Sequence, residues 1–194
     1  MDISQSAPMQ LDLYQGMLIL GVLLWSGAHV FGRIAPARRA AMGPAGRGPV
    51  ALAIVAGIAL MGWGYLKADG PVFWGRTPAL TGINNLLMLL SLYLFAVSGL
   101  KTRLAQYIRH PQLTAVKLWA VSHLLVNGAL EDLILFGGLL AWAVAEVIML
   151  NRQTTWTKPA PAPAKKEIRA VLGTLLIYGG FVAIHYGRGY YVFG

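Results

Sequence analysis

The chain has 194 residues, of which 57% are hydrophobic and 12% are charged, and its formal net charge is +9. Soluble domains carry about 25% charged residues, and one globular core could not bury apolar blocks as long as Leu133–Leu150. The composition therefore predicts one all-α membrane domain over residues 1–194 and excludes a soluble domain with an anchor. The absence of cysteine excludes disulfides, iron–sulfur clusters, thiolate-ligated haem and covalently attached haem.

Six apolar stretches predict transmembrane helices. They cover approximately residues 11–34, 50–66, 83–100, 112–126, 133–150 and 168–186. No basic segment precedes the first stretch, so we expect a retained helix rather than a cleaved signal peptide. Connections rich in proline and glycine separate the stretches. Residues 151–166 form the longest of the late connections, a Pro/Ala-rich linker that we expect on the cytoplasmic side.

The distribution of Lys and Arg predicts the orientation. Three alternate connections together hold twelve of these residues, whereas the opposite connections and the C-terminal tail hold three. Cytoplasmic loops of membrane proteins are enriched in Lys and Arg, so both termini are expected on the non-cytoplasmic side of a bacterial inner membrane. Because the basic residues lie in short loops between apolar stretches, they indicate contact with membrane lipid and not with nucleic acid.

All four histidines lie in or at the ends of the predicted spans. Polar residues in spans are costly and are therefore candidates for function, although a helix–helix hydrogen bond would explain any single one. The predicted topology places His29 and His110 at one depth near the cytoplasmic side. His123, about 20 Å further along its helix than His110, and His185 lie nearer the opposite side. Two histidines at one depth on different helices could clamp a metal or a haem iron.

Charged residues near the cytoplasmic ends of the spans form a second group of candidates. Haem propionates would favour the basic rim, near Arg33, Arg109 or Lys117. Lys117 and Glu146 lie about equally far from the turn that joins their spans. Two interpretations are open for this pair: an ion pair inside the membrane, or two side chains that each reach the cytoplasmic interface.

The segment Tyr107–Leu150 contains the pieces RHPQLTAVKLW, SHLLVNG and LFGGLLAWAV and resembles the signature region of the NnrU family. The resemblance extends to His29 in SGAHVF, to WGY at residues 63–65 and to His185, and it covers nearly the whole chain. It implies a multi-pass membrane protein associated with nitric oxide and nitrite reduction in denitrifying bacteria.

The plant 15-cis-zeta-carotene isomerase is similar to this family and holds haem b through histidines. The resemblance therefore implies haem b as the cofactor here, with His29 and His110 as axial ligands and with His123 and His185 as alternates. The chain lacks the plant protein's extensions, so its status as an enzyme stays open between a haem-dependent isomerase and a redox protein.

Three hypotheses follow. The first is a haem b protein linked to nitric oxide or nitrite reduction, or to cis–trans isomerisation of a lipophilic polyene. The second is a non-catalytic subunit or assembly factor of a larger membrane complex. The third is a transporter with Lys117, His123 and Asn127 along its path, which the absence of an internal repeat disfavours. The R-H-P motif also resembles isoprenylcysteine-type methyltransferases, but their acidic and aromatic C-terminal motif is missing.

Overall fold

A computed structural model describes residues 11–193 and is all-α, as predicted. The main helices are α1 (Leu13–Ile34), α3 (Arg47–Lys67), α4 (Pro78–Leu100), α5 (Pro111–Val126), α7 (Gly138–Gln153) and α8 (Ala164–Gly187). The short segments are α2 (Pro36–Ala41), η1 (Pro44–Gly46), η2 (Arg103–Gln106), α6 (Leu130–Asp132) and the π-helical η3 (Leu133–Gly137). α6, η3 and α7 form one uninterrupted rod.

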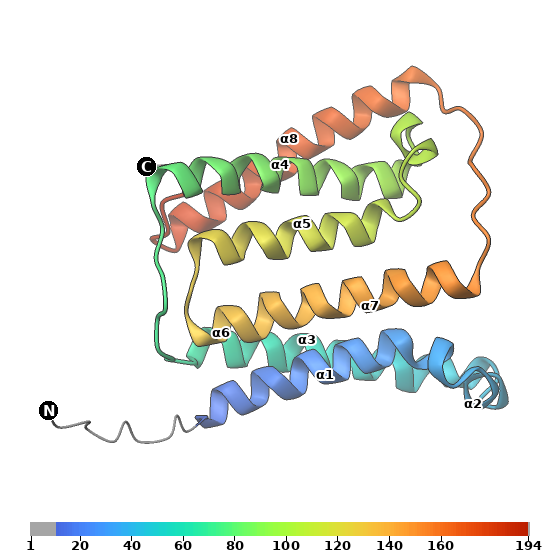
Figure 1. Cartoon of the computed structure of the whole chain (residues 1–194), viewed down its shortest axis with the longest axis horizontal. Helices are drawn as coiled ribbons and strands as arrows, with labels where there is room; N and C mark the ends of the chain where they lie inside the picture. Colours follow the sequence, from blue (N-terminus) through green and yellow to red (C-terminus); the bar gives the residue numbers. More distant parts are fainter. Residues whose placement is uncertain (1–10, 194) are drawn as a thin grey trace, which may run out of the picture.

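Five of the helical rods are long and apolar enough to cross a membrane, so the chain is a multi-pass membrane protein. They are α1, η1 with α3, α4, the α6–η3–α7 rod and α8. The remaining predicted span, residues 112–126, corresponds to α5, which has 16 residues. Its length is about 24 Å, somewhat less than the ~30 Å thickness of a hydrocarbon core. α5 nevertheless runs between α4 and α7 (Figure 1), and the count of crossings is near the predicted six.

The contacts between the main helices give the spatial order α3, α1, α7, α5, α4, α8, which differs from their order in the chain. α1 and α3 form a closely packed pair at one side, and α8 packs mainly on α4 at the other. α7 therefore lies between α1 and α5. As a result, residues of α1 and α7 that are more than 100 positions apart come into contact.

Glycines allow α1 and α3 to approach closely. A Cβ atom added at Gly21 would lie 2.7 Å from the Met61 backbone nitrogen, and one added at Gly64 would lie 2.7 Å from the Tyr14 carbonyl oxygen. At Gly57, the nearest atom would be the Trp25 nitrogen at 3.0 Å. Small residues at such contacts let two backbones pack tightly, which is the main source of helix association inside a bilayer.

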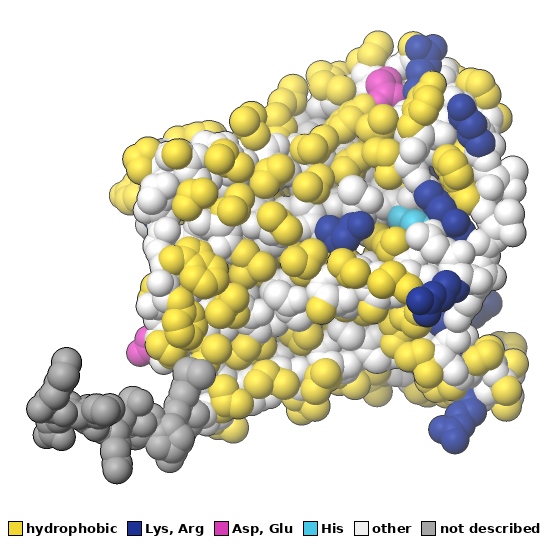
Figure 2. Space-filling model, viewed as in Figure 1, with side chains coloured by type: hydrophobic (Ala, Val, Ile, Leu, Met, Phe, Trp, Pro, Cys, Tyr) yellow, Lys and Arg dark blue, Asp and Glu magenta, His cyan; other side chains and the backbone are white. Residues whose placement is uncertain are grey.

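Lys and Arg side chains gather at one end of the molecule, where Figure 1 places α2 and the connection between α7 and α8 (Figure 2). We call this the basic end. The opposite end, where α1 begins and α8 finishes (Figure 1), is the terminal end. The segregation of charge agrees with the pattern from which the orientation was predicted.

The loop between α3 and α4 packs against the turn between α5 and α6 at the terminal end. The Phe73 N–H donates to the Gly128 carbonyl at 2.7 Å, and the Leu130 N–H donates to the Pro71 carbonyl at 3.0 Å. The Trp74 indole N–H donates to the Leu124 carbonyl at 2.8 Å. These bonds fix the end of α5, which carries His123.

The Pro/Ala-rich connection between α7 and α8 is shorter than predicted. The sequence predicted a linker over residues 151–166, whereas the non-helical stretch is confined to residues 154–163. α7 continues to Gln153, and α8 begins directly after Pro163. Three prolines within the stretch lack a backbone donor and keep it from becoming helical.

Candidate functional site

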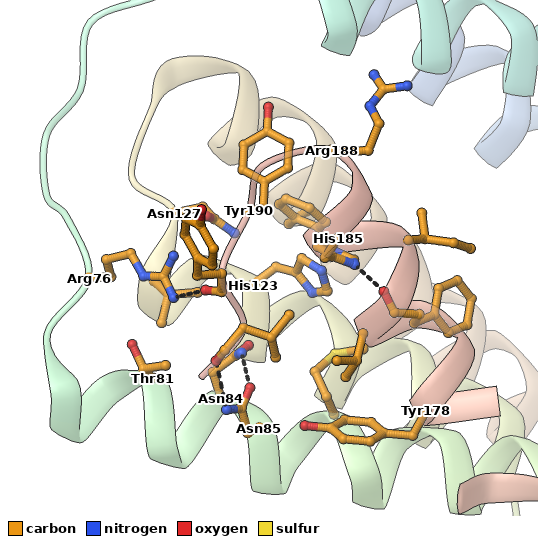
Figure 3. A pocket seen from close by; sticks show the side chains of 18 of the residues that line it. Arg76, Thr81, Asn84, Asn85, His123, Asn127, Tyr178, His185, Arg188 and Tyr190 are labelled. Atoms are coloured by element: carbon orange, nitrogen blue, oxygen red, sulfur yellow. Dashed lines mark hydrogen bonds between the residues drawn. The ribbon is translucent and has the colours of Figure 1, made fainter. Parts of the chain in front are cut away.

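A cavity of about 480 Å³ lies at the terminal end and is lined by residues of α4, α5, α8 and the tail after α8 (Figure 3). Pockets for small molecules and cofactors measure about 300–1,000 Å³. His123 from the last turn of α5 and His185 from the last turn of α8 both line the cavity. The structure therefore brings together the two histidines that the sequence placed near the non-cytoplasmic side.

Both imidazoles have one nitrogen fixed and the other available. The His123 Nδ1 lies 2.9 Å from the Trp119 carbonyl oxygen, and the His185 Nδ1 lies 2.7 Å from the Phe181 carbonyl oxygen. A carbonyl oxygen only accepts, so Nδ1 carries the proton in both rings. In the neutral ring Nε2 is then the nitrogen without a proton, and a backbone carbonyl on the second nitrogen is the usual arrangement for a metal-binding histidine.

Arginine and amide side chains form the polar part of the cavity wall. The Arg76 Nη2 donates to the Tyr191 carbonyl at 2.5 Å, and the Asn85 Nδ2 donates to the Val192 carbonyl at 3.0 Å (Figure 3). These bonds hold the C-terminal tail across the start of α4. Arg188 supplies a second guanidinium to the wall.

Sequence reasoning did not select Arg76, Arg188, Asn84 or Asn85. A signal was present only for the two asparagines, since an Asn-Asn pair within an apolar stretch is costly unless it serves a purpose. Asn127, which the sequence did select, is the residue that ends α5 and lines the same cavity.

The other two histidines occupy separate surroundings. The His29 Nδ1 bonds to the Trp25 carbonyl at 2.8 Å, and its ring centroid lies 5.1 Å from that of Trp142 on α7. The His110 Nε2 lies 2.9 Å from the Asn151 side-chain oxygen, also on α7. Trp142 and Asn151 are nine residues apart, or about 13 Å along the helix. The expectation of equal depth is therefore wrong, while ligation by this pair stays a prediction.

Glu146 pairs with Arg33 and not with Lys117. The Arg33 Nε donates to the Glu146 Oε1, and this is the one salt bridge within residues 11–193. Glu146 is 6% exposed, and its second oxygen has no protein partner in that range. Of the two interpretations that the sequence left open, the ion pair of Lys117 with Glu146 is wrong, because α1 packs against the face of α7 that carries Glu146 and brings Arg33 to it.

Arg109 directly precedes His110, and Lys117 lies further along α5. The Arg109 Nη2 donates to the Thr154 Oγ1 at 3.0 Å and so ties the start of α5 to the linker. Lys117 is half-buried on α5, and its ammonium makes no hydrogen bond or ion pair to the described part of the chain. Neither residue lines the cavity at the terminal end.

The cavity carries the kinds of group that a haem b site uses. Haem in a protein needs nitrogen ligands, apolar surroundings and cations for two propionates. The cavity offers the Nε2 atoms of His123 and His185, the guanidinium groups of Arg76 and Arg188, and aromatic side chains such as Phe136 and Phe181. The Asn84 Oδ1 is buried and unpaired beside this wall, which leaves an acceptor for a protonated propionate or water.

Comparison with known proteins gives one match. No curated protein and no solved structure matches the chain. The family model described as NnrU protein matches residues 17–190, which include all four histidines and all of the main helices except the first four residues of α1. The chain therefore belongs to the NnrU family of membrane proteins.

Proposed function

We propose that this NnrU-family protein binds haem b, with His123 and His185 as the axial ligands. The observation that supports the proposal is that α5 and α8 each direct one imidazole into a single cavity with the Nε2 atom free. Arg76 and Arg188 would pair with the propionates. When bound, haem would supply an iron that exchanges single electrons and takes external ligands.

The residues around the histidines would control ligand strength. The carbonyls of Trp119 and Phe181 fix the tautomer of each ring and increase the basicity of its Nε2. The tail after α8, held by Arg76 and Asn85, forms part of the cavity wall at the terminal end.

His123 and His185 would hold the haem, and its iron would supply the chemistry for either nitric oxide and nitrite reduction or the cis–trans isomerisation of a lipophilic polyene. α8 is the least buried of the long rods, so His185 would be held less firmly than His123. Both reactions belong to the function that the family resemblance implies.

A second candidate, a non-catalytic subunit of a larger membrane complex, is favoured by one observation. α8 directs large apolar side chains away from the bundle, including Leu172 at 62% and Leu176 at 78% exposure. Either lipid or another membrane helix could cover this face. Co-purification of a stoichiometric partner that is lost on Leu176→Lys substitution would support this candidate over the first.

A visible spectrum of the purified protein from haem-replete cells tests the first candidate. We expect the sharp reduced α and β bands of a bis-histidine haem. His123→Ala and His185→Ala should each abolish or broaden these bands. His29→Ala and His110→Ala are the matched controls and should retain them.

Two results would overturn the proposal. The first is that the wild-type protein contains no haem, which would refute haem b as the cofactor. The second is that the bands persist in both His123→Ala and His185→Ala and are lost in His29→Ala and His110→Ala. The ligands would then be His29 and His110, as expected from the sequence.

A further inference from the structure

The rod that carries α7 contains a π-helical turn, η3, over Leu133–Gly137. A π-helical turn holds one residue more than an α-helical turn, and such single turns are frequent at functional sites. At 3.6 residues per turn, one extra residue rotates everything that follows by about 100°. The turn therefore decides which side chains face α5 and which face α1.

The side chains before and after η3 contact different helices. Before it, Asp132 accepts from the Tyr65 hydroxyl at 2.6 Å and from the Ala129 N–H at 2.9 Å. These bonds hold Asp132 to α3 and to the N-terminal capping residue of α6. After it, Gly138 packs against Val22 of α1. The later positions of α7 continue along α1, where Glu146 reaches Arg33.

Phe136 lies inside η3 and faces α5. It is 3% exposed, and its ring stacks on the His123 ring with centroids 4.5 Å apart and an interplanar angle of 25°. Trp119 and Tyr65 meet the same phenyl ring edge-on, at 4.9 and 5.8 Å. Phe136 is therefore held on several sides and cannot easily move away from the imidazole.

Two restraints then act on the His123 ring. The Trp119 carbonyl fixes Nδ1, and Phe136 covers one face. Rotation of the imidazole about its Cβ–Cγ bond would break both contacts at once. The edge that remains free carries Nε2, which is the atom available to the cavity.

We propose that η3 is a positioning element for His123 and that Phe136 is its positioning residue, which keeps Nε2 of His123 directed into the cavity. The functional meaning rests on the proposed role of His123 as a ligand. The physical claim concerns the protein alone: the aromatic contact holds one orientation of the imidazole, in which the Trp119 carbonyl selects the tautomer with the proton on Nδ1.

The test is ¹⁵N NMR of histidine-labelled full-length protein in lipid nanodiscs, before haem is added. His123→Gln identifies the His123 signal. In the wild type we expect a single tautomer with the proton on Nδ1. Phe136→Leu should give a mixture of tautomers or an exchange-broadened signal, whereas Phe136→Tyr, which keeps the stacked ring, should retain the wild-type signal.

Leu139→Ala is the matched control, because Leu139 is a buried residue of the same rod that packs in the apolar cluster with Leu18, Val22 and Met61. It should leave the His123 signal unchanged. An unchanged signal in Phe136→Leu would overturn the proposal, and so would equal loss in Phe136→Leu and Leu139→Ala, since loose packing alone would then explain it. A haem-free wild type with the expected tautomer pattern would refute the proposed function and leave the positioning role intact.

Discussion

Glu146 is a carboxylate buried in a membrane-crossing rod, and Arg33 is its ion-pair partner. The Arg33 side chain is 31% exposed and lies toward the basic end, whereas the Glu146 side chain is 8% exposed. A charge in such a place is tolerated because the partner neutralises it, and removal of one partner leaves the other uncompensated. The pair also connects α1 to α7, which are far apart in sequence.

A double-mutant cycle on the unfolding free energy measures this connection. We expect Arg33→Ala to destabilise the protein by about 2 kcal/mol, between the values for exposed and fully buried pairs. Arg33→Ala combined with Glu146→Ala should cost less than the sum of the single changes, because neither charge is left alone. Lys117→Ala combined with Glu146→Ala should be additive, and coupling there would restore the pair expected from the sequence.

At the scale of the element, the α1–α3 interface depends on glycines that face the partner helix. Gly64 faces α1, where an added Cβ would meet backbone atoms of Tyr14 and Leu18 within 3 Å. Gly62, two residues earlier on the same helix, has no atom within 4 Å of such a Cβ. The two positions therefore separate the effect of packing from the general effect of losing a glycine.

We expect Gly64→Ala to lower stability by about 1–3 kcal/mol, since the clash is with backbone that cannot move aside cheaply. Gly62→Ala should change stability by less than about 0.5 kcal/mol in either direction. Thermal unfolding of the two variants in the same detergent provides the comparison. Equal midpoints would show that α1 and α3 are held by something other than close backbone contact.

The existence of most helices could be predicted from the sequence, because bilayer thickness fixes the length of an apolar stretch. The residues at which the helices begin and end were harder to predict. Pro78 follows Thr77, whose hydroxyl caps α4 by accepting from the Leu80 N–H, so α4 begins five residues before the apolar stretch. η3 left no trace in the hydrophobic pattern, since every one of its residues is apolar or glycine.

The site was only partly predictable for a related reason. A depth could be predicted for each helix, and it placed His123 and His185 near the same side of the membrane, where both line one cavity. It could not provide the lateral order of the helices. Treating adjacent spans as neighbours made an ion pair of Glu146 with Lys117 one of the two open interpretations, whereas α1 packs beside α7 and brings Arg33. Arg76 and Arg188 come from loops whose course depends on the finished fold.

At the scale of the whole molecule, polar and apolar layers alternate along α1. Gln15 is buried at the terminal end, and Arg33 meets Glu146 at the basic end. The apolar cluster of Leu18, Val22, Met61 and Leu139 lies between them along the helix. A cluster of this kind interrupts any polar path along the α1–α7 interface and separates the buried polar groups at the two ends of α1.

The orientation of the terminal-end cavity in the membrane is a prediction of the charge distribution, and it decides from which side a ligand arrives. Because the chain contains no cysteine, single cysteines can be introduced without background labelling. Gly75 lies in the exposed loop at the terminal end, and Ala160 lies in the exposed linker at the basic end. The variants Gly75→Cys and Ala160→Cys therefore place one thiol at each end. With twelve Lys and Arg residues in the connections of one side against three on the other, the basic end should face the cytoplasm. A membrane-impermeant maleimide should then label Gly75→Cys in intact spheroplasts and Ala160→Cys only after permeabilisation, and the reverse pattern would place the cavity on the cytoplasmic side.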